Sequence, residues 1–268
     1  MSLAKMIESL QERIETAPEA VDDPHIKCPN CPLCDGYGNI MDERGGRPCP
    51  NALASARKKA INADMAGWEG WPPPTLAQMR GLPGFVETPS FLAVEKVAAE
   101  LFTGKRPQGL ILCGGHGRCK TLAPLALIHE CSEKGLTTAA VHYPELIDAY
   151  KKGIDGQPFI NSTYKRIKAA ALVLVDEYGR EPQWGNADHT TQAIERIVSL
   201  CYRNMYLIIT SNLPKNTQYS ADRKKVISLG MDRALPSDVC SRLGRNAGYC
   251  TVIEEPVKAD LRGKLWDK

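Results

Sequence analysis

The sequence lacks any apolar run of the ~20 residues that a helix needs to cross a bilayer. Its first residues, MSLAKMIESLQERIE, are amphipathic and acidic and so unlike a secretory signal, and we expect a cytoplasmic protein with no membrane partner. No segment repeats at a period of about 20–50 residues. A composition of 43% hydrophobic and 24% charged residues excludes disorder as the main state.

A strong overall charge is also lacking, but the charge is unevenly distributed along the chain. The net charge is +3, yet residues 1–50 hold five Lys and Arg against nine Asp and Glu, a net −4 that leaves +7 for the remainder. An acidic N-terminal part followed by a basic remainder favours an N-terminal part that binds protein and a remainder that faces nucleic acid.

Short apolar strands alternate with helices from residue 90 onward. We expect strands at 109–113, 137–143, 171–177, 206–212 and 248–254. Such alternation predicts an α/β fold with a central parallel sheet flanked by helices, whose ligands bind at the carboxyl ends of the strands. Little chain follows the last strand, so no C-terminal helical lid is expected.

The strand at 109–113 runs into a near match to the phosphate-binding loop G-x-x-x-x-G-K-[ST]. In such loops backbone N–H groups and a helix N-terminus bind phosphates, the Lys reaches the β- and γ-phosphates, and the Thr hydroxyl ligates Mg²⁺. The pattern predicts ATP and Mg²⁺ as cofactors. The expected nucleotide ligands are Gly114, Gly115, His116, Gly117, Arg118, Cys119, Lys120 and Thr121.

One position departs from the loop pattern, because Cys119 stands where a Gly before the Lys is expected. The side chain of Cys119 crowds the phosphates, whereas Gly lets the backbone approach them closely. We expect working nucleotide binding with slow turnover, and a site that binds without hydrolysis is the alternative.

Polar residues at later strand ends complete the expected ATPase site. Asp176 would hold Mg²⁺ and Glu177 would polarise the attacking water. Asn212 is expected to orient water or contact the γ-phosphate. Arg242 is the candidate for a residue that reaches a neighbouring subunit's γ-phosphate, which requires a homo-oligomer; the alternatives are Arg245 and Arg203.

Four cysteines lie close together as Cys28-x2-Cys31-x2-Cys34-x14-Cys49. This spacing predicts a structural Zn²⁺ site with four thiolates, while the nearby His25 leaves the ligand set open. A module this small needs a metal to fold, so metal binding and folding should be coupled.

The distribution of Gly and Pro predicts the domain organisation. Residues 1–64 form an N-terminal helix and a zinc-binding module for a partner, the Gly- and Pro-rich residues 65–89 form a linker, and residues 90–268 form the ATPase domain.

The motifs GLILCGGHGRCKT, ELIDAYKK, ALVLVDEYG, YLIITSNLP and SDVCSRLGR, in this order, resemble those of the replicative-helicase loaders of the DnaC/DnaI type, a branch of the AAA+ ATPases that includes IstB-type transposition helpers. The resemblance implies an AAA+ P-loop domain that binds ATP and single-stranded DNA and oligomerises. It also implies an N-terminal module that binds the hexameric replicative helicase. The cysteine cluster is similar to the zinc module of DnaI-like loaders and favours a loader.

Contact with single-stranded DNA has local support in a segment that interleaves basic residues with an aromatic ring, as backbone tracking and base stacking require. The candidate residues are Tyr164, Lys165, Arg166 and Lys168. Two alternative functions stay open. One is a nucleotide-binding adaptor with negligible hydrolysis, and the other is an IstB-like helper that acts on duplex DNA.

Overall fold

The computed structural model describes residues 31–34, 39–42, 45–65, 68, 71–115, 120–180, 187–220, 226–243 and 249–255. At its centre is a parallel sheet of five strands in the order β4-β5-β6-β3-β9. The strands are β3 (Gly109–Cys113), β4 (Thr138–His142), β5 (Leu172–Tyr178), β6 (Tyr206–Ser211) and β9 (Cys250–Glu254). All five expected strands and the parallel sheet are confirmed.

Burial explains why the strand sequences are so apolar. Every residue of β3 and β6 is buried, and in β5 only Glu177 is partly exposed. Strands covered on both faces need apolar side chains on both sides, so continuous apolar runs replace the alternating pattern of a half-exposed sheet.

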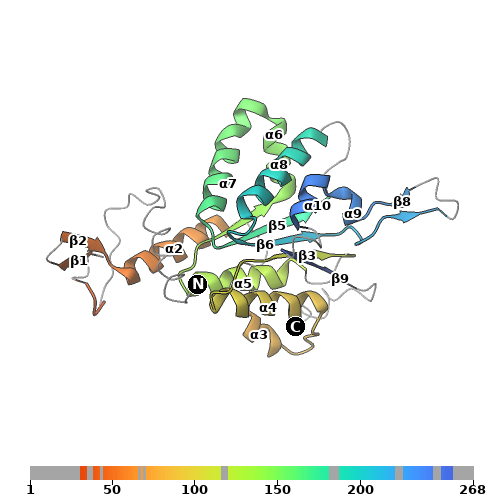
Figure 1. Cartoon of the computed structure of the whole chain (residues 1–268). Coiled ribbons are helices and arrows are strands. Elements are labelled where there is room, and N and C mark those ends of the chain that lie inside the picture. The colour runs from red at the N-terminus through yellow and green to blue at the C-terminus, as the bar shows by residue number, and fades with distance from the viewer. Residues whose placement is uncertain are drawn as a thin grey trace.

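Helices cover both faces of the sheet (Figure 1). One face carries α6 (Tyr143–Lys151), the 3-10 turn η1 (Gly153–Gly156), α7 (Gln157–Ala169) and α8 (Ala187–Cys201). The other face carries α3 (Leu76–Arg80), α4 (Pro89–Phe102) and α5 (Leu122–Glu133). Each layer has its own hydrophobic cluster against the sheet.

The helix that follows the cysteines, α2 (Pro50–Met65), packs on this body. Ile61 and Met65 are buried in the same cluster as α4 and α5, and Lys58 forms an ion pair of 2.7 Å with Glu133 of α5. The expected linker contains α3, and Trp68 of that segment packs against the same cluster. The boundaries 1–64, 65–89 and 90–268 stay predictions.

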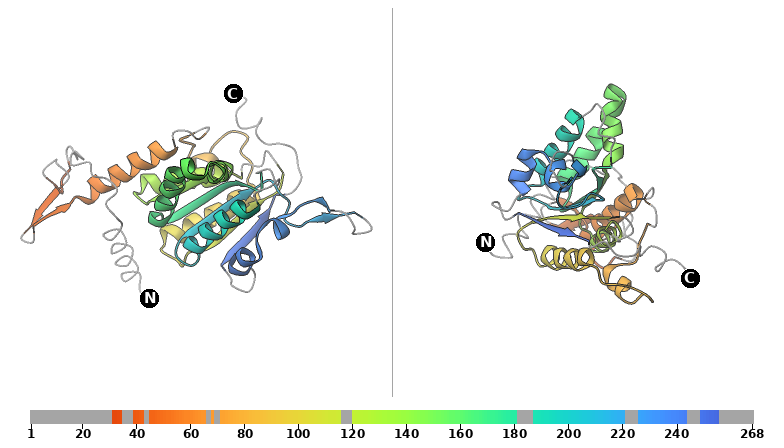
Figure 2. Two further views of the ribbon diagram at one scale, coloured as in Figure 1. Left: turned by 90° about the horizontal axis from the view of Figure 1, so that it is seen from above. Right: turned by 90° about the vertical axis from the view of Figure 1, so that its right-hand side faces the viewer.

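Two small hairpins extend from opposite sides of the body (Figure 2). One is formed by β1 (Asn39–Asp42) and β2 (Gly45–Pro48), and the other by β7 (Gln218–Tyr219) and β8 (Val226–Ser228). The second leads into α9 (Met231–Ala234) and α10 (Ser237–Leu243).

Two expectations fall on parts of the chain outside this description. The expected N-terminal helix falls within residues 1–30, and the expected absence of a C-terminal lid concerns residues 256–268. Among the described helices, none is long and apolar enough to span a membrane.

Candidate nucleotide-binding site

The phosphate loop begins at a position where the backbone requires glycine. Gly114 has φ +114°, and a Cβ there would lie 2.8 Å from the carbonyl oxygen of Glu255. The Gly114 N–H donates to the carbonyl of Leu213 (2.8 Å), and the Glu255 N–H donates to the carbonyl of Cys113 (2.9 Å). These bonds hold the start of the loop between the chain segments that follow β6 and β9.

The centre of the expected loop lies outside the described residues. His116, Gly117, Arg118 and Cys119 belong to it, so their phosphate contacts and the effect of the Cys119 side chain stay predictions. Gly115 is described, and no atom of the described residues lies within 4 Å of a Cβ built on it.

Lys120 is held at the N-terminal end of α5. Its side chain is only 6% exposed, and its Nζ donates to the carbonyl of Gly115 (2.7 Å) and to Oδ1 of Asn212 (3.2 Å). A buried ammonium needs such oxygen partners. The contact with Asn212 brings together the loop on β3 and the residue just after β6, as the sequence predicted.

Asp176 lies opposite the loop and is 4% exposed. Its Oδ1 accepts hydrogen bonds from the hydroxyls of Thr121 (2.8 Å) and Thr210. Burial raises the pKa of this carboxyl, and the nearby Glu177 adds to the rise, although the two hydroxyls and His142 oppose it. A hydroxyl beside a desolvated carboxylate is a pair of hard oxygen donors, so Thr121 and Asp176 fit Mg²⁺.

Glu177 is held in an unusual backbone conformation and by two basic partners. Its φ is +59°, its N–H donates to Oγ1 of Thr210 (3.1 Å), and its Oε2 lies 3.0 Å from Nε2 of His142. Arg180 Nη1 donates to both carboxylate oxygens (2.6 and 2.5 Å). Burial raises the pKa of Glu177, but the bonds from Arg180 and His142 outweigh it, so the net shift is downward. The carboxylate is therefore ionised at neutral pH.

Three polar residues of this site were missed in the sequence. His142 ends β4 and is the strand partner of Asp176, Thr210 lies near the end of β6, and Arg180 follows β5 by two residues. Their positions at or just after strand ends could have identified them in the sequence, because the carboxyl ends of parallel strands meet at one edge of the sheet.

His142 is expected to be a positioning residue for Glu177. His142→Ala should lower ATP turnover roughly 10- to 100-fold, because loss of the contact lets the carboxylate shift by a fraction of an ångström or more. The Kd for ATP should stay within about twofold. His129→Ala is the control, since His129 bonds to the carbonyl of Pro73 on the α5 side. Equal turnover in the two variants would contradict the assignment.

The strand order, the phosphate-loop residues and the acidic pair at the carboxyl edge define an AAA+ P-loop nucleoside triphosphatase fold. The chain is similar to a solved structure of a DNA replication initiation factor, with 16% identity and a TM-score of 0.51 over 72% of this chain and 52% of that one. It is equally similar to replication initiator DnaA bound to AMPPCP and single-stranded DNA, with 18% identity and a TM-score of 0.51 over 72% and 53%.

The chain thus spans about half the length of these two structures, and the likeness concerns the fold. A structure of DnaI is 19% identical, with a TM-score of 0.46 over 71% of this chain and 91% of that one. No family model matches the sequence, and no curated protein matches it.

The candidates for the residue that acts in a neighbouring subunit differ in position. Arg242 lies on α10, which packs against α8, and no hydrogen bond or ion pair links Arg242 to the described residues. Arg203 stacks on Tyr202 just before β6 begins. It therefore lies at the amino ends of the strands, whereas the nucleotide site lies at their carboxyl ends. Arg245 lies outside the described residues. The geometry therefore disfavours Arg203.

The expected DNA-binding segment is only partly at the surface. Tyr164 is 2% exposed, its hydroxyl bonds to that of Tyr150 (2.9 Å), and Arg196 covers its ring at 4.0 Å. The prediction that Tyr164 stacks on a base is wrong, because this residue lies on the face of α7 that packs on the sheet. Lys165 and Lys168 are exposed, and Arg166 pairs with Asp64 of α2 (3.3 Å).

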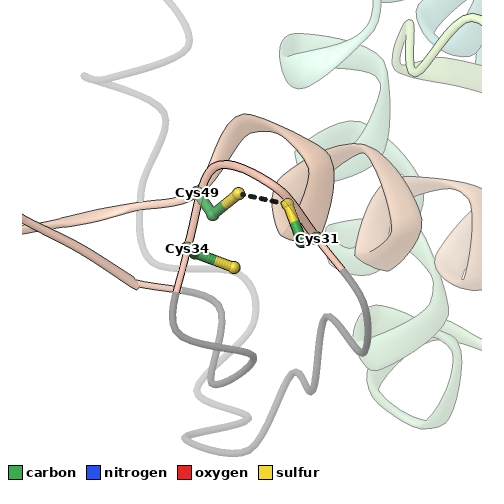
Figure 3. A group of neighbouring side chains, drawn as sticks. All are labelled: Cys31, Cys34 and Cys49. Carbon is green, nitrogen blue, oxygen red and sulfur yellow. Dashed lines mark hydrogen bonds between the residues drawn. The ribbon is translucent and has the colours of Figure 1, made fainter.

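The cysteine cluster forms a second candidate site, at the start of α2. The Sγ atoms of Cys31, Cys34 and Cys49 point toward one another (Figure 3) and all lie within 4.8 Å of one another. The Cys31 and Cys49 sulfurs are 3.6 Å apart, close to the ~3.8 Å edge that Zn–S bonds of ~2.3 Å give in a tetrahedron. The three thiols fit Zn²⁺, and Cys28, the fourth expected ligand, lies outside the described residues.

Proposed function

We propose that this protein is an ATP-dependent helicase loader of the DnaC/DnaI type that acts in DNA replication. The AAA+ domain binds ATP with Mg²⁺ and single-stranded DNA, and it oligomerises so that Arg242 reaches the γ-phosphate of a neighbour. The N-terminal module binds Zn²⁺ through Cys28, Cys31, Cys34 and Cys49 and binds the hexameric replicative helicase.

One observation carries the nucleotide part of this proposal. The hydroxyl of Thr121 and the carboxylate of Asp176 meet at 2.8 Å, and Lys120 and Asn212 meet at 3.2 Å, although each pair is separated by more than 50 residues in sequence. A triphosphate with Mg²⁺ matches this combination of an ammonium, two hard oxygens and a helix N-terminus. The role in replication rests on the motif order and the cysteine module.

Steady-state ATP hydrolysis with and without single-stranded DNA tests the proposal. We expect turnover that single-stranded DNA stimulates and that Lys120→Ala abolishes, because the ammonium no longer reaches the β- and γ-phosphates. Stimulation by duplex DNA in place of single strands would favour an IstB-like helper. Turnover no higher than that of Lys120→Ala would leave the adaptor function.

The adaptor alternative depends on Cys119, and its test is Cys119→Gly. Removing the Cβ and sulfur beside the phosphates should raise ATP turnover by about tenfold, which corresponds to ~1.4 kcal/mol of barrier. Cys240→Gly is unsuitable as a control because Cys240 lies inside α10, so Cys240→Ala is used. If Cys119→Gly hydrolyses no faster than the natural protein, Cys119 does not limit turnover.

A further inference from the structure

The chain segments that lead into the central strands carry a row of basic residues. Lys134 precedes β4, Lys168 precedes β5, Arg203 precedes β6, and Lys105 and Arg106 precede β3. Because β4, β5, β6 and β3 are parallel neighbours in this order, their amino ends lie side by side. We call the surface formed by these five basic residues the amino edge.

The charge of the amino edge has one sign. The segments that connect α4 to β3, α5 to β4, α7 to β5 and α8 to β6 contain no Asp or Glu. All five basic residues are exposed, and no ion pair links any of them to another residue that the structure describes. The nearby carboxylate of Glu133 is already paired with Lys58 of α2 at 2.7 Å. A surface of this kind attracts a polyanion.

Two of the five cations are held over aromatic rings. Nζ of Lys134 lies 4.5 Å from the ring centroid of Phe102, and Cζ of Arg203 lies 4.9 Å from that of Tyr202. A cation over a ring face is attracted to it and keeps its full charge. These contacts fix both charges before a ligand arrives, which reduces the side-chain ordering that binding requires.

The ends of the neighbouring helices do not account for the row. The partial negative charge at a helix C-terminus attracts cations, but the effect falls off within the last turn. The last turns of α4, α5 and α8 contain no basic residue, and that of α7 contains Lys168 together with Arg166. The other four cations of the amino edge lie beyond the last turns, where an external anion can reach them.

The shape of the row favours a single strand of phosphates. Neighbouring strands of a sheet are about 4.8 Å apart, so the three spacings from β4 to β3 extend the row over roughly 14 Å. A nucleic-acid strand carries one negative charge per nucleotide along a line. A duplex instead presents two backbones across a groove, whereas the amino edge follows the end of one sheet.

We propose that the amino edge binds the phosphate backbone of single-stranded DNA. The five cations pair with phosphates and contact no base, so binding does not depend on sequence. This inference rests on the proposed binding of single-stranded DNA and assigns its surface, which shares only Lys168 with the segment predicted from the sequence. The candidate nucleotide site lies at the carboxyl ends of the same strands, so DNA and ATP bind without competition.

Fluorescence anisotropy of labelled oligo(dT) of about 15 nucleotides, titrated with the full chain at several salt concentrations, tests the surface. Five phosphate contacts should give a slope of log K against log salt of about −3.5, at roughly −0.7 per contact. The double variant Lys105→Gln with Arg203→Gln removes two of the charges. Its slope should fall to about −2.1, with binding weakened roughly 10- to 30-fold at about 0.1 M salt. An unchanged Kd and slope would overturn the amino edge.

The matched control is Lys96→Gln with Arg233→Gln, which removes the same two charges elsewhere. Lys96 is exposed on α4, and Arg233 of α9 lies over the ring of Tyr219 at 5.4 Å, much as Arg203 lies over Tyr202. The control should keep its Kd within about twofold of the natural protein. Equal weakening in both double variants would show that binding follows total charge alone, and would overturn the proposal.

Three further measurements separate the other outcomes. Saturation with AMPPCP and Mg²⁺ should leave the Kd for oligo(dT) unchanged, and competition would place the DNA at the nucleotide site instead. A duplex that loses affinity in the Lys105→Gln and Arg203→Gln variant, while oligo(dT) does not, would overturn the assignment to single strands. The melting temperature of that variant should match the natural protein, and a lower value with unchanged DNA binding would make the two cations structural.

Failure of this surface and failure of the proposed function give different results. Binding of oligo(dT) that the Lys105→Gln and Arg203→Gln variant retains would overturn the amino edge alone. If the natural protein binds no oligo(dT), the proposed binding of single-stranded DNA is itself overturned.

Discussion

Glu177→Gln should lower steady-state ATP turnover by roughly 100- to 10 000-fold, the range that a positioned general base contributes. The amide keeps the size of the side chain but cannot take a proton from the attacking water. The Kd for ATP should change little, because the triphosphate and Mg²⁺ are expected to contact Lys120, Thr121 and Asp176 instead. Single-turnover hydrolysis and binding of a fluorescent ATP analogue measure the two quantities separately.

Glu254→Gln is the matched control for this prediction. Glu254 also ends a strand of the same sheet, and its Oε1 accepts from the backbone N–H of Lys215 (2.9 Å), away from the acidic pair. Its turnover should stay within about twofold of the natural protein. A Glu177→Gln variant that retains turnover would move the base to another residue.

Cys49→Ser should remove tight Zn²⁺ binding, reducing the affinity by more than the ~100-fold that loss of an outer partner typically costs. The buried Cys49 is the residue just before α2, and a Ser hydroxyl does not ionise to replace its thiolate. Because metal binding supplies the folding free energy of so small a module, the amides of β1 and β2 should lose their protection in hydrogen exchange. Release of zinc to a chromogenic chelator gives the stoichiometry.

Cys240→Ser is the control, because Cys240 is a partly buried thiol on α10 with no part in the cluster. It should retain one Zn²⁺ per chain, and the exchange of β1 and β2 should match that of the natural protein. Retention of stoichiometric zinc by Cys49→Ser would show that Cys49 is not a ligand. Protected amides in the zinc-free protein would instead argue that the module folds without metal.

The sheet was predictable because each strand is a short apolar run bounded by polar residues, and burial on both faces demands that pattern. The main site residues were predictable for a related reason. Lys120, Asp176 and Asn212 follow three such runs, and parallel strands bring their carboxyl ends to one edge.

The residues that were missed or misassigned depend on tertiary contacts. His142 looked like part of an ordinary strand end, and only its neighbour in the sheet makes it a partner of Glu177. Tyr164 was assigned to DNA from its basic neighbours. Ile160 and Ile167 place it on the buried face of α7, a helical spacing that the sequence did contain. The packing of Trp68 on the body could not be predicted from a Gly- and Pro-rich segment, and the packing of α2 depends on contacts with helices far along the chain.

Because α2 packs on the body of the protein, it links the cysteine cluster to the body that carries the candidate nucleotide site. Its 16 residues span about 24 Å, with Cys49 just before one end and Met65 buried in the body at the other. A molecule held by the cluster would therefore sit at a set distance and angle from the sheet. Its position relative to the sheet would not vary over the range that a flexible linker allows. Any tilt of α2 would change the ion pair between Asp64 and Arg166, which lies beside β4, the edge strand that ends in His142.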